Sequence, residues 1–275
     1  MKKIVLTQKQ PVVNPNIPVE AEVITPDNFA SKTRVEIGEL IIWRGNRQIP
    51  IKEIFELTGD EQAGDTAAET EIVLIGELSK YKHIGEKMTA GLITIKGSIG
   101  MHLGSLMKGG KILVEENADD FAGANMSGGE IHIKGNAGHY LGGSMRGNWR
   151  GMNGGKIKVD GNVLNECGIW MRKGLIEIDG SASMFIGMHM HNGTIIVRGD
   201  VTERAGAEMT GGELIILGKL FKNLPSFEYK ETIEELPIEN YGTVKGPLLV
   251  FIGDYAERKQ GKMYLLKKKN EELIS

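Results

Sequence analysis

The chain has 275 residues, with 33 Lys and Arg against 36 Asp and Glu and a formal net charge of −3. This balance gives no electrostatic reason to expect nucleic acid as a partner, because phosphate binding depends on clustered basic residues. No apolar run approaches the roughly 20 residues that span a bilayer, and the start turns polar too soon for a signal peptide. We therefore expect a cytoplasmic protein without membrane contact, whose single cysteine forms no internal disulfide.

Residues 1–75 lack the pattern that follows and are expected to form a small α+β extension. Residues 3–6 are predicted as a strand, and Thr25-Pro26-Asp27 has the features of a helix start with a capping side chain. Two further strands are expected over residues 39–45 and 49–57, around a tight connection. The polar segment 59–70 is the best candidate for a linker.

A repeat of 19 residues dominates residues 76–220. A pattern of Gly followed by aliphatic residues two and four positions later recurs at spacings of 19, 19, 26, 19, 19 and 19 residues. Its glycines are Gly91, Gly110, Gly129, Gly155, Gly174, Gly193 and Gly212. Three residues before them stand Met88, Met107, Met126, Met152, Met171, Met190 and Met209. Because 29 of the 38 glycines fall between Gly85 and Gly218, the glycine excess belongs to this repeat.

The alternation of aliphatic and other residues in each copy predicts a short strand with one buried face. Glycine tolerates positive φ, so it suits the bends between three such segments in each copy. At about 3.3 Å per residue, one copy is long enough for a three-sided turn around a packed interior. Stacked turns pair each strand in parallel with its copies above and below. The repeat therefore predicts an all-β parallel β-helix of about seven turns, with the methionines in its core.

The fourth copy carries seven extra residues between Gly142 and Met152, and Trp149 stands where the other copies have their first glycine. Arg146, Trp149 and Arg150 lie in this insertion. Arg and Trp are enriched at the energetic centres of protein interfaces, so the insertion is a candidate contact with a partner. A surface loop without a function is the alternative.

Residues 221–275 are expected to form a cap and a charged tail. Residues 248–252 and 262–266 are predicted to pair as a closing hairpin, and residues 267–272 are charged. Atypical ends are expected of a solenoid, because its open edges would otherwise invite aggregation.

Three groups of residues could have a chemical role. His189 and His191 are spaced like metal ligands on a presumed strand, but no third ligand accompanies them. His83 and His102 occupy equivalent positions in successive copies and should stack, as part of an exposed or partner-facing column. Cys167 lies in an apolar column and is most simply a small buried residue. The sequence thus predicts a scaffold with no catalytic, cofactor-binding or metal-binding residues.

The seven-fold repeat, with its Trp149 variant, resembles the C subunit of formylmethanofuran dehydrogenase and, more distantly, the C-terminal β-helix domain of the large glutamate synthase subunit. Residues 24–30 and 42–46 resemble the N-terminal extension of that dehydrogenase component. The resemblance implies a right-handed coil and membership of an oxidoreductase complex. That complex reduces CO2 and attaches it to methanofuran as a formyl group in methanogenesis.

The resemblance also implies the partners. They are an amidohydrolase-like A subunit with zinc, pterin-binding B and D subunits with molybdenum or tungsten, and iron-sulfur subunits, while this chain holds no cofactor. The homologous C subunit of the methylotrophic formyltransferase/hydrolase complex, which lacks the redox half, is one alternative. A free-standing β-helix acyltransferase is another, although its six-residue period differs from the 19-residue repeat.

Overall fold

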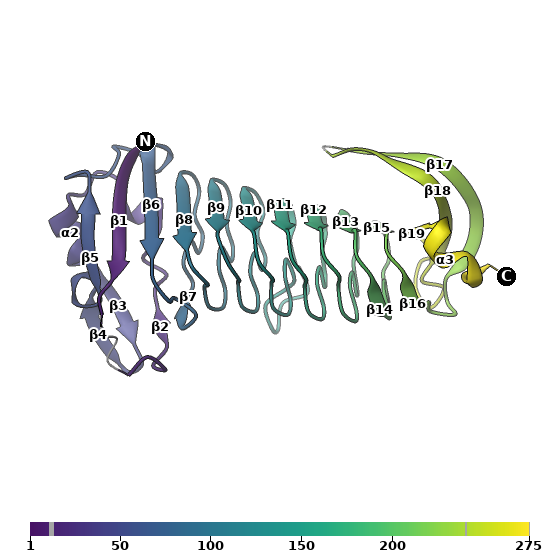
Figure 1. Cartoon of the computed structure of the whole chain (residues 1–275), viewed down its shortest axis with the longest axis horizontal. Coiled ribbons are helices and arrows are strands. Elements are labelled where there is room, and N and C mark those ends of the chain that lie inside the picture. The colour runs from purple at the N-terminus through teal and green to yellow at the C-terminus, as the bar shows by residue number, and fades with distance from the viewer. Residues whose placement is uncertain (11–13, 240, 275) are drawn as a thin grey trace.

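A long, mostly parallel sheet of 13 strands forms the body of the protein (Figure 1). The computed structural model describes residues 1–10, 14–239 and 241–274. Residues 11–13, in the predicted extension, and residues 240 and 275, in the predicted cap, lie outside the described residues. The prediction of a mostly β, largely parallel architecture is confirmed.

Each copy of the repeat contributes one strand to this sheet. The strands are β8 (Leu92–Lys96), β9 (Lys111–Val114), β10 (Glu130–Ile133), β11 (Asn153–Val159), β12 (Lys173–Ile178), β13 (Thr194–Val197) and β15 (Glu213–Ile216). Neighbours pair in parallel at equivalent repeat positions, so that Ile112 lies beside Ile131 and Ile131 beside Ile157. The repeat length therefore sets the register of the sheet.

A second parallel ladder runs along another side of the stack. It consists of bridges that join Leu78, Ile99, Ala118, Ala137, Val163, Ala182 and Val201 in turn. The short strands β14 (Val201–Glu203) and β16 (Leu220–Lys222) continue it. Because each copy contributes to both ladders, the chain completes one circuit per copy, which Figure 1 shows as a row of similar loops.

Apolar side chains fill the inside of these circuits. All seven repeat methionines have 0% exposure, as does Cys167 in the neighbouring apolar column. Complete burial of a methionine side chain contributes about 1.5–3 kcal/mol, and its flexible thioether adapts to irregular gaps. The interior is thus a continuous packed core rather than a channel.

The corners of the circuits use left-handed backbone conformations at glycine and at other residues. Gly129 has φ +84°, but His102 and Phe121 have φ 64° and 63°. Such a conformation costs a non-glycine residue about 1–2 kcal/mol. The His102 N–H donates to the carbonyl of Asp120 at 2.9 Å, and the Phe121 N–H donates to that of His139 at 2.8 Å. These bonds between copies offset the strain.

Gly142, and not Trp149, occupies the first-glycine column of the fourth copy. Gly142 has φ +61°, and a Cβ added to it would lie 3.2 Å from Ile157 Cδ1, much as a Cβ added to Gly123, with φ +65°, would lie 2.5 Å from that atom. Trp149 lies in the loop that follows, and the Met152 N–H returns to the Gly142 carbonyl at 2.9 Å. The insertion lies between Gly142 and Met152, as predicted, but the alignment of Trp149 with the first glycine is wrong because Gly142 holds that position.

The N-terminal residues extend the sheet. β6 (Thr70–Ile75) pairs in parallel with β8 on one side and with β1 (Lys2–Gln8) on the other. On its far side, β1 pairs antiparallel with β5 (Phe55–Gly59). A second sheet has the order β4 (Arg47–Pro50), β3 (Ile41–Arg44), β2 (Val19–Glu20) and β7 (Tyr81–Lys82). Helix α1 (Pro26–Phe29) begins after the expected cap, Thr25, and α2 (Arg34–Gly38) follows it.

Two N-terminal predictions need correction. The strand expected over 49–57 is interrupted by the 3-10 helix η1 (Ile51–Glu53), because β4 and β5 belong to different sheets and the chain must turn between them. The expected linker 59–70 is packed structure, with Ala63 buried and a 3-10 helix η2 (Ala67–Glu69).

At the other end, β18 (Gly242–Gly253) and β19 (Gly261–Leu266) form the predicted antiparallel hairpin. β19 also pairs in parallel with β15 and so continues the main ladder. The strand β17 (Glu228–Ile238) was not predicted, and with β18 it forms an arch that curves back over the sheet (Figure 1). Leu236, Ile238 and Val244 of the arch belong to one apolar cluster with Leu175, Ile196 and Ile215 of the sheet.

The charged segment 267–272 is ordered. It forms α3 (Lys267–Asn270) and begins η3 (Glu271–Leu273). The buried Asn270 side chain accepts from the Leu220 N–H at 2.8 Å and donates to the Gly218 carbonyl at 3.0 Å, which satisfies backbone groups of the last circuit. No helix in the described part of the chain is long and apolar enough to cross a membrane.

We predict that Gly129→Ala destabilises the protein far more than Gly147→Ala. Both glycines have positive φ, so both variants incur the strain of a left-handed alanine. At Gly129 the new Cβ also lies 2.9 Å from the Gly110 carbonyl oxygen and the Gly109 carbonyl carbon, whereas at Gly147 nothing lies within 4 Å. We expect an additional loss of about 1–3 kcal/mol, measured by denaturant unfolding. Equal losses would contradict the close stacking of the copies.

Candidate functional site

The insertion in the fourth copy is a loop fixed by Asn125. The Asn125 side chain accepts from the Met145 N–H at 2.8 Å and donates to the Arg150 carbonyl. The Arg172 guanidinium donates to the Trp149 carbonyl at 3.4 Å. Both ends of the loop are therefore held against neighbouring copies. Because the loop is already ordered, a binding partner loses less free energy to the conformational entropy of fixing it.

Aromatic side chains gather at this loop. Trp149 is 66% exposed, and its ring lies 6.1 Å from that of Trp170. Trp170 in turn stacks on His189, with centroids 4.1 Å apart and planes within 10°. A cavity of about 310 Å³ lies between Trp149, Trp170 and Tyr140. An exposed Trp beside a small cavity is typical of an interface anchor.

The arginines at the insertion form no ion pair with other described residues. Arg146 and Arg150 are exposed, Arg172 is half-buried, and none of them forms an ion pair within residues 1–10, 14–239 and 241–274. The charges on the main sheet behave differently. There, Lys111 pairs with Glu130 at 2.9 Å, Lys158 with Asp179 at 3.2 Å, and Arg198 with Asp179 at 2.9 Å.

A column of stacked rings leads to the insertion from the N-terminal end. The predicted stack of His83 on His102 is confirmed, with centroids 4.6 Å apart. Phe121 and Tyr140 continue it at 4.9 and 4.5 Å, and Tyr140 lines the cavity beside Trp149. Burial, together with the neighbouring His83, lowers the pKa of His102.

The structure gives no metal-binding or nucleophilic role to the other candidates, His189, His191 and Cys167, among the described residues. His189 has φ 54° and lies in a turn, so the strand presumed for His189 and His191 is wrong. His191 Nδ1 lies 2.7 Å from Thr210 Oγ1, and no group of three or more His, Cys, Asp or Glu in the described chain could hold a metal. Cys167 is fully buried, and desolvation raises the pKa of its thiol to about 12, so it stays protonated at neutral pH.

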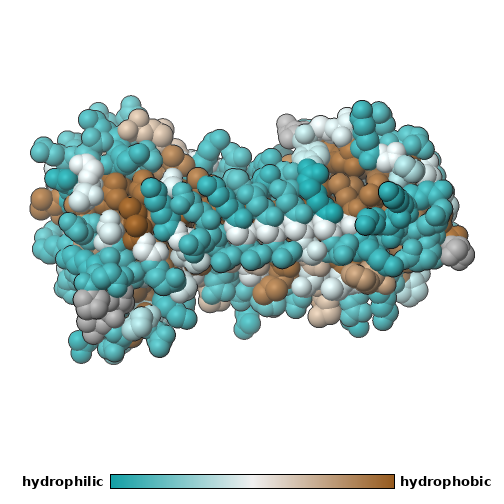
Figure 2. Space-filling model, in the orientation of Figure 1, coloured by the Kyte–Doolittle hydropathy of each residue, from teal (hydrophilic) through white to brown (hydrophobic). Residues whose placement is uncertain are grey.

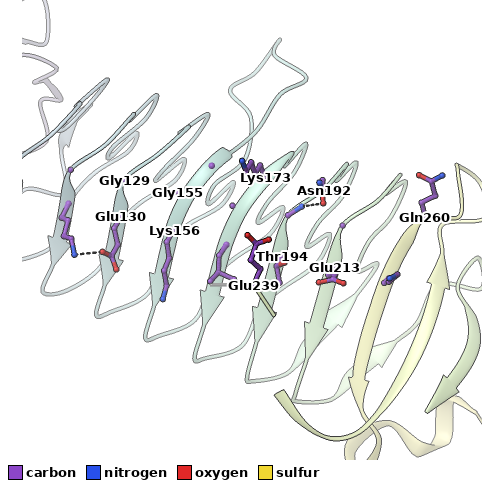
Figure 3. Close-up of a pocket in the computed structure, with 18 residues that line it drawn as sticks. Gly129, Glu130, Gly155, Lys156, Lys173, Asn192, Thr194, Glu213, Glu239 and Gln260 are labelled. Atoms are coloured by element: carbon purple, nitrogen blue, oxygen red, sulfur yellow. Dashed lines mark hydrogen bonds and ion pairs between the residues drawn. The ribbon is translucent and has the colours of Figure 1, made fainter. Parts of the chain in front are cut away.

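A groove of about 1110 Å³ lies between the main sheet and the arch (Figure 3). The glycines Gly110, Gly129, Gly155, Gly174, Gly193 and Gly212 line it, together with outward-facing polar side chains of the strands. Lys111 pairs with Glu130 at 2.9 Å and Lys156 with Glu177 at 3.5 Å, and Glu213 Oε1 lies 3.3 Å from the Tyr264 hydroxyl. Figure 2 shows hydrophilic side chains over the central copies and hydrophobic ones at the N-terminal elements and under the arch.

Sequence analysis missed a ladder of polar side chains that joins the copies. The Asn117 side chain accepts from the Asn136 N–H, that of Asn136 from the Asn162 N–H, and that of Asn162 from the Ser181 N–H, each at 2.8 Å. These asparagines recur at the repeat spacing, so a signal was present in the sequence. Asn125 gave no such signal, because its contacts with the insertion depend on the fold.

The repeat and its glycine corners match a known family. The family defined by the GXGXG motif matches residues 73–245, which is more than half of the chain. The chain belongs to the GXGXG motif family.

Relatives of this GXGXG-family chain agree with the resemblance that the repeat indicates. The chain is 46% identical over 101 residues to the C subunit of molybdenum-containing formylmethanofuran dehydrogenase 1 of Methanosarcina barkeri, which covers 37% of this chain and 32% of the relative. It is 43% identical over 101 residues to the C subunit of tungsten-containing formylmethanofuran dehydrogenase 2 of Methanothermobacter thermautotrophicus, covering 37% and 36%. The matched stretch thus spans about a third of these relatives.

A solved structure extends the likeness to nearly the whole chain. It is a chain of the formyltransferase/hydrolase complex of Methylorubrum extorquens, determined in complex with methylofuran. The superposition has a TM-score of 0.84 at 25% identity and covers 95% of this chain and 99% of the other. The likeness therefore includes most of both ends and not the repeat alone.

We predict that Asn125→Gly loosens the insertion. Glycine suits the φ of 57° at this position, so the variant removes the side-chain bonds to Met145 and Arg150 without adding strain. With two bonds of about 1 kcal/mol lost, we expect trypsin to cut after Arg146 and Arg150 about 10-fold faster. The control is Leu106→Gly, at the equivalent corner one copy earlier with φ 59°. Equal cleavage of both variants would contradict the role of Asn125.

We also predict that His102 makes the fold less stable in acid. Its pKa is lowered in the folded chain, so the unfolded chain binds the proton more tightly, and stability falls as pH drops through about 6.5. The charges near the ring are His83 and Lys82, which oppose its protonation, and Glu20 and Glu86, which favour it.

His102→Phe retains a ring in the stack and should lose less thermal stability than the wild type between about pH 7.5 and 5.5. His132→Gln, which removes a histidine outside the column that is paired with Asp160, is the control. An unchanged pH profile for His102→Phe would show that this histidine does not contribute.

Proposed function

We propose that this chain is the C subunit of a formylmethanofuran dehydrogenase, as a non-catalytic scaffold of the complex that fixes CO2 on methanofuran during methanogenesis. The observation that carries the proposal is the 46% identity to the corresponding subunit of such a dehydrogenase. The superposition of almost the whole chain on a component of a related complex supports it.

In this proposal the cofactors belong to the partners. The amidohydrolase-like A subunit holds zinc, the B and D subunits hold the molybdenum or tungsten pterin, and further subunits hold iron-sulfur clusters. The chain positions these subunits in the cytoplasm so that formate passes from the redox subunits to the amidohydrolase-like subunit.

The scaffold role follows from the stiffness of the stack. Strands lie about 4.8 Å apart, so seven copies separate the two ends by roughly 30 Å. The backbone bonds between copies keep that distance fixed, and the insertion offers Trp149 and Arg150 as anchors part-way along it. We assign the amidohydrolase-like subunit to this position.

The same proposal divides the chain into an extension (1–75), a β-helix (76–220) and a cap (221–275). We infer that the coil of the β-helix is right-handed, because about 98% of parallel crossovers have that hand. The arch and α3 then close the last circuit.

A second candidate is the C subunit of a formyltransferase/hydrolase complex, which the structural match favours. Affinity purification of the tagged chain from its native source, with mass spectrometry and metal analysis, separates the two. Pterin and iron-sulfur subunits with molybdenum or tungsten are the expected result. A formyltransferase partner without those metals would favour the second candidate, and a chain recovered alone would refute both.

We predict that the double variant Trp149→Ala/Arg150→Ala binds the amidohydrolase-like subunit at least about 10-fold more weakly, because exposed Trp and Arg anchors often contribute 2 kcal/mol or more. Titration of one purified subunit with the other measures this affinity. Phe221→Ala is the control, since Phe221 is also an aromatic residue, 61% exposed, and lies outside the insertion. Unchanged affinity of the double variant would remove the insertion from the interface.

A further inference from the structure

The three arginines at the insertion form no ion pair within the described chain, in a protein whose net charge is −3. Arg146 lines the cavity, Arg150 follows Trp149 in the same loop, and the Arg172 guanidinium donates to the Trp149 carbonyl while its Nε is buried without a hydrogen-bond partner. On the main sheet, by contrast, Arg198 pairs with both Glu177 and Asp179. Three arginines without an ion pair leave guanidinium groups that the carboxylates of a partner can neutralise.

The shape of the site adds an apolar requirement. The cavity beside Trp149 is lined mainly by the loop 144–149, Tyr140, Ile169 and Trp170, and its volume of about 310 Å³ suits one or two side chains. An occupant must therefore present carboxylates to the arginines and an apolar side chain to the cavity. Arginine binds carboxylates with paired N–H donors, which gives such contacts direction as well as strength.

We propose that the insertion surface, defined as Arg146, Trp149, Arg150, Trp170 and Arg172, docks an acidic segment of a partner subunit whose apolar side chain enters the cavity beside Trp149. The inference rests on the proposed function in one respect: the partner is taken to be a subunit of the complex proposed above. Charge complementarity and the cavity select the occupant.

A protein segment fits this surface better than a nucleic acid does. Two carboxylates lie close to this surface, since Glu166 interacts with the Tyr140 hydroxyl and Glu208 lies 3.4 Å from the His189 ring. They would repel an extended polyphosphate but can be avoided by a short acidic segment. The Trp149 loop is also held in place before binding, as hot-spot anchors of protein interfaces require.

The test compares Arg146→Glu/Arg150→Glu with Lys108→Glu/Lys134→Glu. The two lysines are exposed on other parts of the repeat, and the control makes the same change in net charge. Binding to the purified amidohydrolase-like subunit is measured at about 50 and 300 mM salt, where screening differs strongly. We expect the wild type and the control to weaken at least 5-fold at high salt. The arginine variant should bind at least 30-fold more weakly and lose this salt dependence.

A cross-linking experiment locates the acidic segment. Arg146→Lys/Arg150→Lys retains the charges and supplies amines that a carbodiimide joins to carboxylates in contact with them. We expect cross-links to Asp or Glu of the amidohydrolase-like subunit, and binding without any such cross-link would overturn the proposal.

The outcomes distinguish this inference from the proposed function. If the wild type binds the amidohydrolase-like subunit but the arginine variant binds equally well, the acidic segment is wrong and the scaffold role stands. If the wild type binds none of the subunits, the proposed function fails as well. Binding of a 20-nucleotide single-stranded RNA probe by the wild type and not by the arginine variant would replace the acidic segment with nucleic acid.

Discussion

Hydrogen bonding between the backbones of successive copies is the constraint on which the rest of this structure depends. Every circuit must present its N–H and C=O groups to the next circuit at the same places, so all copies share one backbone path. That requirement accounts for the constant repeat length, for the glycines at corners where a Cβ would meet the neighbouring backbone, and for left-handed residues such as His102. Side chains inside the circuits, such as Met126, then need only fill the space that the backbone leaves.

A stack built in this way has two open ends, and the rest of the chain closes them. At the N-terminal end β1 continues the ladder and the antiparallel strand β5 ends it. At the C-terminal end β19 continues the ladder, while the buried Asn270 satisfies backbone groups of the last circuit. The arch covers the apolar outer face of the last copies, which would otherwise be exposed to water. These additions protect strand edges that would favour aggregation.

The insertion is the place where the chain departs from the repeat without closing an end. Residues within the repeat pack against or pair with neighbouring copies, whereas the loop after Gly142 carries side chains that take no part in this stacking. Asn125 holds that loop, and Trp149 and the arginines remain available to a partner. A rigid stack with one displayed loop suits a component that positions other subunits.

The sequence by itself determined the repeat, its parallel stacking, the buried methionines and the stacked histidines, because the pattern that predicts them recurs in every copy. It also located the insertion, since an interruption of a regular period is visible without a structure. Only the tertiary structure decided what lies beside the insertion. Trp170 and Asn125 contact it from other circuits, His189 stacks on Trp170, and the arch depends on contacts between β17 and strands far away in the sequence. A contact that occurs only once in the stack produces no recurring pattern, so the sequence alone does not reveal which residues make it.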